Sequence, residues 1–197
     1  MNGGSAPVEA PSTHARSLRA ALEVVRNDGI EALTTRAIAR RSGLTQPAIY
    51  RHFSGIDELI RELLGEIRAG FHERLLSSSR AGTPADRLRA AMDVFREFAI
   101  EEPRLYDALF LQTADANTPL PPVDPERGGH IFGYLVQRIA ACMDAGEMPS
   151  EGPVRVALSL AAHAQGLILL YRQGRFGSNE RFSEFYRRAM EEWITIG

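Results

Sequence analysis

The stretch that decides the fold is residues 34–53, TTRAIARRSGLTQPAIYRHF, and its pattern predicts two short helices joined by a tight turn. Thr34 and Thr45 are hydroxyl residues of the kind that cap helix N-termini. Gly43 can adopt the left-handed conformation that ends a helix. Because only Leu44 and Thr45 separate Gly43 from the second helix, the two helices must cross steeply, as in a DNA-binding helix-turn-helix.

The second helix has the composition of a recognition helix, because it is short, rich in small residues and polar on one side. Pro47 lies in its first turn, where the missing backbone N–H costs nothing. Helix corners with these caps also occur in all-helical proteins that bind no nucleic acid, so the shape alone leaves that alternative open. The pattern predicts that Gln46, Pro47, Tyr50 and Arg51 face outward and that Ala48, Ile49 and Phe53 face inward.

The distribution of charge favours DNA binding. From Ser12 to His52 the chain has seven Arg and three acidic residues, a balance of +4. The whole chain has a formal net charge of −2, so the rest of it carries −6. A basic region at one end of an acidic protein is what attraction to phosphate requires.

The same region resembles the N-terminal domain of the TetR family of bacterial repressors. The resemblance covers about residues 12–60 and rests on the segment NDGIEALTTRAIA, which ends a first helix at a Gly, and on LTQPAIYRHF before a long fourth helix. It implies a three-helix DNA-binding head (12–55) and a ligand-binding, dimerising body (56–197). The body is then expected to hold a small-molecule effector that releases the repressor from a palindromic operator.

The motif match also implies individual contacts with double-stranded operator DNA. One position departs from the family pattern, because Ile56 stands where a lysine usually opens the fourth helix, and a phosphate anchor is lost there. The expected contacts are phosphate or a base edge for Thr35 and Arg36, phosphate for Thr45, Tyr50, Arg51 and His52, adenine for Gln46, and a thymine methyl for Pro47.

Outside the head, hydrophobic periodicity predicts an all-α protein of about nine helices. A fourth helix of about 22 residues would be roughly 33 Å long and would link head and body. Residues 1–11 have the composition of a disordered tail. Asn117 to Arg127 contains four prolines, which exclude regular helix, and is expected to form a loop or a lid over the effector pocket. The other helices are expected at about 12–27, from 84, from 103, and at 128–145, 153–171 and 179–194.

Two features of the body point to binding partners. The segment VRVALSLAAHAQGLILLYRQG is apolar on nearly all sides, and the last helix has a broad apolar face (Phe182, Phe185, Tyr186, Ala189, Trp193). A two-fold operator requires a dimer, so these two helices are the expected homodimer interface, with a plain core face as the alternative. The candidate effector-binding residues are Phe95, Phe98, Tyr106, Phe110, His130, Tyr134 and His163, with Gln112 and Gln165 as further polar groups.

Other classes of function find no support in the sequence. Phosphate-binding loops and the common hydrolase motifs are absent, and the five histidines lie on different predicted helices, so no enzyme activity, metal or cofactor is predicted. The single cysteine, Cys142, is expected to be a small buried hydrophobe.

The expected location is the cytoplasm. The longest apolar run, Leu167 to Tyr171, is too short to span a membrane, and the N-terminus has no signal-peptide pattern. One alternative stays open, a helical ligand-binding or protein-interaction module without operator binding. It is favoured by the acidic pair Asp57 and Glu58, which follows Ile56 at the start of the fourth helix.

Overall fold

The computed structural model describes residues 11–78, 81–111, 130–150 and 152–195. Over these residues the chain forms nine α-helices, one short 3-10 turn and no strand, which confirms the predicted all-α class. The elements are α1 (Thr13–Asp28), η1 (Ile30–Ala32), α2 (Thr35–Ser42), α3 (Gln46–Tyr50), α4 (Ile56–Ser78), α5 (Pro84–Glu101), α6 (Pro103–Phe110), α7 (His130–Asp144), α8 (Pro153–Arg172) and α9 (Asn179–Thr195).

The helix boundaries follow from local capping chemistry. The side chain of Thr34 accepts a hydrogen bond from the Ala37 N–H, and that of Thr45 accepts one from the Ala48 N–H, so both predicted caps are confirmed. Gly43 ends α2 with φ 67° and ψ 22°, the left-handed conformation that a residue with a Cβ adopts only under strain. Residues 43–45 therefore separate α2 from α3, which is five residues long.

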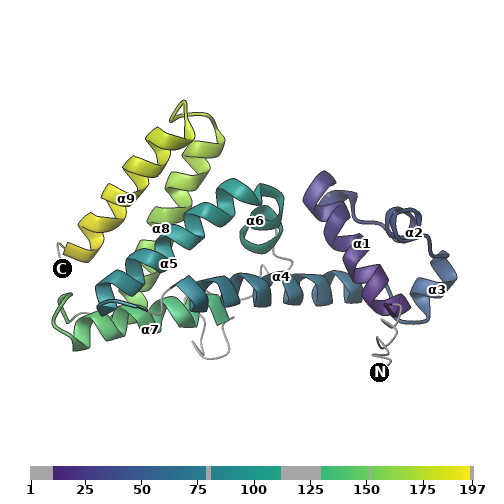
Figure 1. Ribbon diagram of the computed structural model, residues 1–197, viewed down its shortest axis with the longest axis horizontal. Coiled ribbons are helices and arrows are strands. Elements are labelled where there is room, and N and C mark those ends of the chain that lie inside the picture. The colour runs from purple at the N-terminus through teal and green to yellow at the C-terminus, as the bar shows by residue number, and fades with distance from the viewer. Residues whose placement is uncertain (1–10, 79–80, 112–129, 151, 196–197) are drawn as a thin grey trace, which may run out of the picture.

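The helices are arranged as a small head and a larger body joined by α4 (Figure 1). In the head, α1 packs against α2, α3 and the start of α4. The 23 residues of α4 correspond to a helix about 34 Å long. In the body, α5 packs against α4, α6, α7, α8 and α9. Figure 1 shows α9 beside the C-terminal half of α8, on the side of α5 away from α4.

The short helix α6 makes a second link between body and head, which the sequence did not predict. It contacts α1 as well as α4 and α5, and Figure 1 shows it between the two parts of the molecule. The Arg26 Nε of α1 lies 2.9 Å from the Glu102 Oε2 that precedes α6, and Arg104 donates to the Asn27 carbonyl. The position of α6 therefore bears directly on α1.

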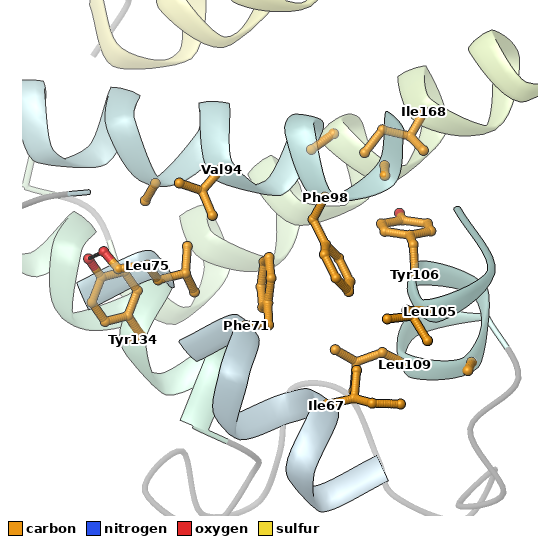
Figure 2. Packing of buried hydrophobic residues seen from close by; sticks show 14 of the residues in the cluster. Ile67, Phe71, Leu75, Val94, Phe98, Leu105, Tyr106, Leu109, Tyr134 and Ile168 are labelled. Carbon is orange, nitrogen blue, oxygen red and sulfur yellow. Dashed lines mark hydrogen bonds between the residues drawn. The ribbon is translucent and has the colours of Figure 1, made fainter. Parts of the chain in front are cut away.

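The buried apolar side chains form one continuous core that includes residues of both head and body. Figure 2 shows its centre in the body, where Phe98 of α5 lies between Phe71 of α4 and Tyr106 of α6. Cys142 is fully buried, as predicted, and burial raises the pKa of its thiol. Three predicted features lie outside the described residues, namely the tail apart from Pro11, the proline-rich segment from Asn117 to Arg127, and Gln112.

Candidate functional site

The recognition helix α3 is anchored on one side and free on the other. Ile49 and Phe53 are buried in the core, whereas Ala48 is half-buried. This arrangement confirms which side of α3 faces the protein and presents the opposite side to solvent. The exposed residues on and around it are Thr45, Gln46, Pro47, Tyr50, Arg51 and His52.

Thr35 and Tyr50 form a contact between α2 and α3 that the sequence did not reveal. The Thr35 Oγ1 and the Tyr50 hydroxyl lie 3.2 Å apart, within hydrogen-bond distance. Tyr50 is 52% exposed, but Thr35 is only 8% exposed. Of the eight residues expected to contact DNA, Thr35 is thus the one whose side chain faces the protein, and its hydroxyl holds that of Tyr50.

The arginines of the head divide into two groups. Arg16 donates to the Ser42 carbonyl at 2.8 Å, and Arg41 lies 3.5 Å from Glu23 and 3.7 Å from Asp28, so these two side chains have partners in the head. By contrast, Arg36, Arg40 and Arg51 are exposed and form no ion pair with any part of the chain that the structure describes. Arg36 and Arg40 are one helical turn apart on α2, so they share a face.

Of the two acidic residues at the start of α4, Glu58 has a hydrogen-bond partner in the preceding turn. The Glu58 carboxylate accepts the Ser54 backbone N–H at 2.5 Å, and hydrogen bonds to Ser54 lower the pKa of this carboxyl. Glu58 is therefore directed towards the turn that precedes its own helix. Asp57 remains exposed, and Ile56 is half-buried.

Four of the seven candidate effector-binding residues come together in one aromatic cluster. The ring centroids of Phe95 and Phe110 are 5.0 Å apart, those of Tyr106 and Phe110 are 4.9 Å apart, and Phe98 lies beside Phe71 at 4.8 Å. Phe95 and Phe110 are half-buried, whereas Phe98 and Tyr106 are buried. The cluster joins α4, α5 and α6.

The other candidates lie elsewhere. The Tyr134 hydroxyl of α7 donates to the Leu75 carbonyl at 3.1 Å, which ties α7 to the end of α4 (Figure 2). The Nδ1 of His163 in α8 accepts a hydrogen bond from the Trp193 indole N–H at 2.7 Å. His130 is the first residue of α7, and its side chain is outside the described part of the chain.

None of the seven candidates lines the surface depression of about 400 Å³ between the end of α8 and the start of α9. That depression is bounded by Tyr171, Arg172, Gly174, Gly177, Ser178 and Asn179.

The last two helices expose apolar side chains over part of their surface. Leu169 and Leu170 of α8 are 50% and 44% exposed, and Phe185 of α9 is 52% exposed. By length and composition α8 could cross a membrane, with a mean hydropathy of 1.4 over a window of which 33% is buried. Because α8 contains no long uninterrupted apolar run, the sequence pattern did not indicate this property. Only part of the predicted apolar face of α9 is available to a partner. Phe182, Tyr186 and Ala189 are buried in the core, as expected for the alternative of a plain core face.

Comparison with known proteins identifies the family. Residues 18–63 match the family described as "Bacterial regulatory proteins, tetR family", and residues 88–193, more than half of the chain, match "Tetracyclin repressor-like, C-terminal domain". The chain belongs to the TetR family. As a member, it is a DNA-binding transcriptional regulator.

Individual TetR-family members agree with this assignment. The probable transcriptional regulator ArpR of Pseudomonas putida is 25% identical over 169 residues, 81% of this chain and 80% of ArpR. The class A tetracycline repressor of Escherichia coli is 42% identical over 53 residues, 25% of this chain and 24% of the repressor. A solved structure of a protein of unknown function from Rhodococcus sp. RHA1 has the same fold, with a TM-score of 0.80 at 19% identity, covering 96% of this chain and 97% of that one.

Proposed function

We propose that this TetR-family member is a cytoplasmic repressor that binds a two-fold operator as a homodimer and is released from it by a small-molecule effector. In this proposal residues 12–55 form the DNA-binding domain, and residues 56–197 form the effector-binding and dimerisation domain. The role is one of binding, and it assigns no catalytic reaction, metal or cofactor.

The observation that carries the DNA-binding part is the exposed side of α3, together with exposed arginines on α2 and at the C-terminal end of α3 that form no ion pair with the described residues. Gln46 and Pro47 open α3 and are free to reach base edges, while the N-terminus of α3 offers backbone N–H groups to phosphate. Unpaired cations next to such a helix attract the phosphate backbone. The proposed phosphate contacts are Arg36, Thr45, Tyr50, Arg51 and His52. We add Arg40 to this proposal because it is exposed and lies one helical turn from Arg36 on α2.

The DNA-binding part is tested by letting the wild-type protein select duplexes from a random-sequence library. The selected DNA should contain two inverted half-sites about one helical turn apart, because the two recognition helices of a dimer must enter successive major grooves. Arg36→Gln and Arg51→Gln should each reduce the salt dependence of binding by about one unit of log–log slope. Arg188→Gln, on the exposed side of α9, is the control and should leave the slope unchanged.

If the wild type enriches no duplex, operator binding is refuted, and the alternative function, a helical ligand-binding or interaction module without an operator, is favoured.

The exposed apolar side of α8 supports the dimer. Ala162 and Gly166 are both exposed and lie one turn apart, and a Cβ at Gly166 would meet no atom within 4 Å. Small residues at this spacing allow a second helix to approach closely, while Leu169 on the same side supplies apolar area for burial. A second copy of this chain would cover the side of α8 that the fold leaves exposed.

Light scattering tests the dimer. The wild type should be a dimer at micromolar concentration without detergent, and Leu169→Glu should shift it to monomer or aggregate. Leu76→Glu is the matched control, because Leu76 is an equally exposed leucine on α4, and it should leave the dimer intact. A monomeric wild type would refute the interface, and a wild type that requires detergent would indicate that α8 inserts into a membrane.

Two elements provide a route from effector to operator. α4 extends from the head into the body, so a tilt of its far end changes the spacing of the recognition helices, which must be about 34 Å. α6 carries Tyr106 and Phe110 of the aromatic cluster and is held to α1 through Glu102 and Arg104. An effector that binds more tightly to a state in which α6 is shifted would weaken DNA binding. By the same linkage, bound DNA must lower the affinity for the effector.

A further inference from the structure

Two buried tyrosine hydroxyls in the body have no hydrogen-bond partner among the described residues. Tyr106 of α6 and Tyr186 of α9 are each 1% exposed, and neither hydroxyl bonds to any residue that the structure describes. Folded proteins rarely leave a buried hydroxyl unpaired, because the group loses water without replacing it. Tyr134 shows the usual outcome in the same body, since its buried hydroxyl donates to the Leu75 carbonyl.

The unpaired hydroxyls lie in the same part of the core. α5 packs against both α6 and α9, the helices that carry them. The Tyr106 ring is 5.5 Å from Phe95 and 4.9 Å from Phe110, and Figure 2 shows it beneath Ile168 of α8. Tyr186 packs against Phe182 at 5.7 Å. Burial raises the pKa of Tyr186 well above its ordinary value, and the proximity of Tyr106 adds to that rise.

The charged groups near these hydroxyls are already paired. Arg172 binds Asp107, with its Nη2 2.6 Å from Oδ2. Arg96, which is itself buried, donates to Asp93, Glu97 and Ser183. A carboxylate or an ammonium ion placed beside the tyrosines would therefore lack a free counter-ion, and an unpaired charge in such surroundings is costly.

We propose that the Tyr106 and Tyr186 hydroxyls are the polar contacts of the effector, and that the effector is an uncharged, largely apolar molecule with a hydrogen-bonding oxygen, such as an aromatic ketone. The inference rests on the proposed effector-regulated function and specifies the ligand class. The aromatic cluster suits a flat apolar body, and the hydroxyls supply the few polar groups that orient a ligand in such a site. Phe95 and Phe110, the half-buried rings next to Tyr106, must turn aside on binding.

Thermal unfolding of the full-length protein without ligand is the first test. Tyr106→Phe and Tyr186→Phe remove unpaired hydroxyls, so each should leave the Tm unchanged or raise it. Tyr134→Phe removes a paired one and should lower the Tm by about 2–4 °C. A comparable fall for Tyr106→Phe or Tyr186→Phe would show that the hydroxyl already has a partner, such as a buried water, and would overturn the proposal.

Binding of a neutral fluorescent ketone, 6-propionyl-2-(dimethylamino)naphthalene, is the second test. The wild type should bind it with a blue-shifted emission, and each of Tyr106→Phe and Tyr186→Phe should weaken binding about fivefold, the effect of one hydrogen bond. Tyr134→Phe should bind it like the wild type, because the Tyr134 hydroxyl is already bonded to the Leu75 carbonyl and its ring lies outside the aromatic cluster. The anionic 1-anilinonaphthalene-8-sulfonate should bind more weakly than the ketone.

The ligand class would be refuted by any of three results. These are no binding of the ketone, equal ketone affinity in the wild type and the Tyr106→Phe and Tyr186→Phe variants, or tighter binding of the anion than of the ketone. The selected duplex provides a separate readout on the same samples. Intact operator binding alongside a negative result with the ketone would refute this inference alone, whereas loss of operator binding by the wild type would refute the proposed function.

Discussion

The contact between Thr35 and Tyr50 allows the DNA-binding geometry to be tested residue by residue. The Tyr50 hydroxyl lies 3.2 Å from the Thr35 Oγ1, and its ring is 52% exposed on the side proposed to face DNA. The same hydroxyl can therefore hold α3 to α2 and also contact a phosphate. Tyr50→Phe removes both interactions, whereas Thr35→Val removes only the first.

The magnitudes follow from burial. Tyr50→Phe leaves the Thr35 hydroxyl, which is 8% exposed, without its partner, and should lower the free energy of unfolding by about 1 kcal/mol. It should also weaken binding to the selected duplex by about 1 kcal/mol, or roughly fivefold, through the lost phosphate contact. Thr35→Val is nearly isosteric and should cost similar stability, but it frees the Tyr50 hydroxyl and should leave DNA affinity unchanged or improve it.

Fluorescence anisotropy with the selected duplex and thermal unfolding measure the two effects independently. The double variant should be about as stable as either single variant, because all three lack the same hydrogen bond. The reasoning would be refuted if Thr35→Val weakened DNA binding as much as Tyr50→Phe. That result would mean that the hydroxyl pair only spaces α2 and α3, and that Tyr50 makes no phosphate contact.

Three further predictions concern caps and ion pairs. Thr45→Ala should cost about 1 kcal/mol of stability through loss of the α3 cap, and Thr45→Asn, which can cap, should restore most of it in the same denaturation assay. Arg26→Glu should reduce the effect of ketone binding on operator affinity, and the added change Glu102→Arg should restore that effect. The pair should contribute at most about 1 kcal/mol, because both side chains are partly exposed. The lowered pKa values of Glu58 and Asp86 mean that their capping contributions are present above about pH 4 and are lost as pH falls through the folded-state pKa. Glu58→Gln should accordingly make the fall in Tm below pH 4 shallower, whereas an unchanged acid profile would show that this cap does not contribute.

The sequence by itself determined the local architecture of the head. Caps at Thr34 and Thr45, the left-handed Gly43 and the outward side of α3 depend on interactions within a few residues, so a pattern of residue types is enough to specify them. The all-α class could be predicted for a similar reason, because helical periodicity is a local property. The aromatic cluster was partly foreseen, since four of its residues were candidates for the effector site.

Only the tertiary structure decided which polar groups have partners. The seven arginines of the head look alike in sequence, yet Arg41 pairs with Glu23 and Asp28 while Arg36 forms no ion pair with the described residues. The three buried tyrosines of the body also look alike, yet only the Tyr134 hydroxyl meets a carbonyl. These outcomes, like the contact of α6 with α1, join residues 13 to 77 positions apart. Side-chain pairing at such separations depends on how whole helices pack, and no local pattern of residue types encodes it.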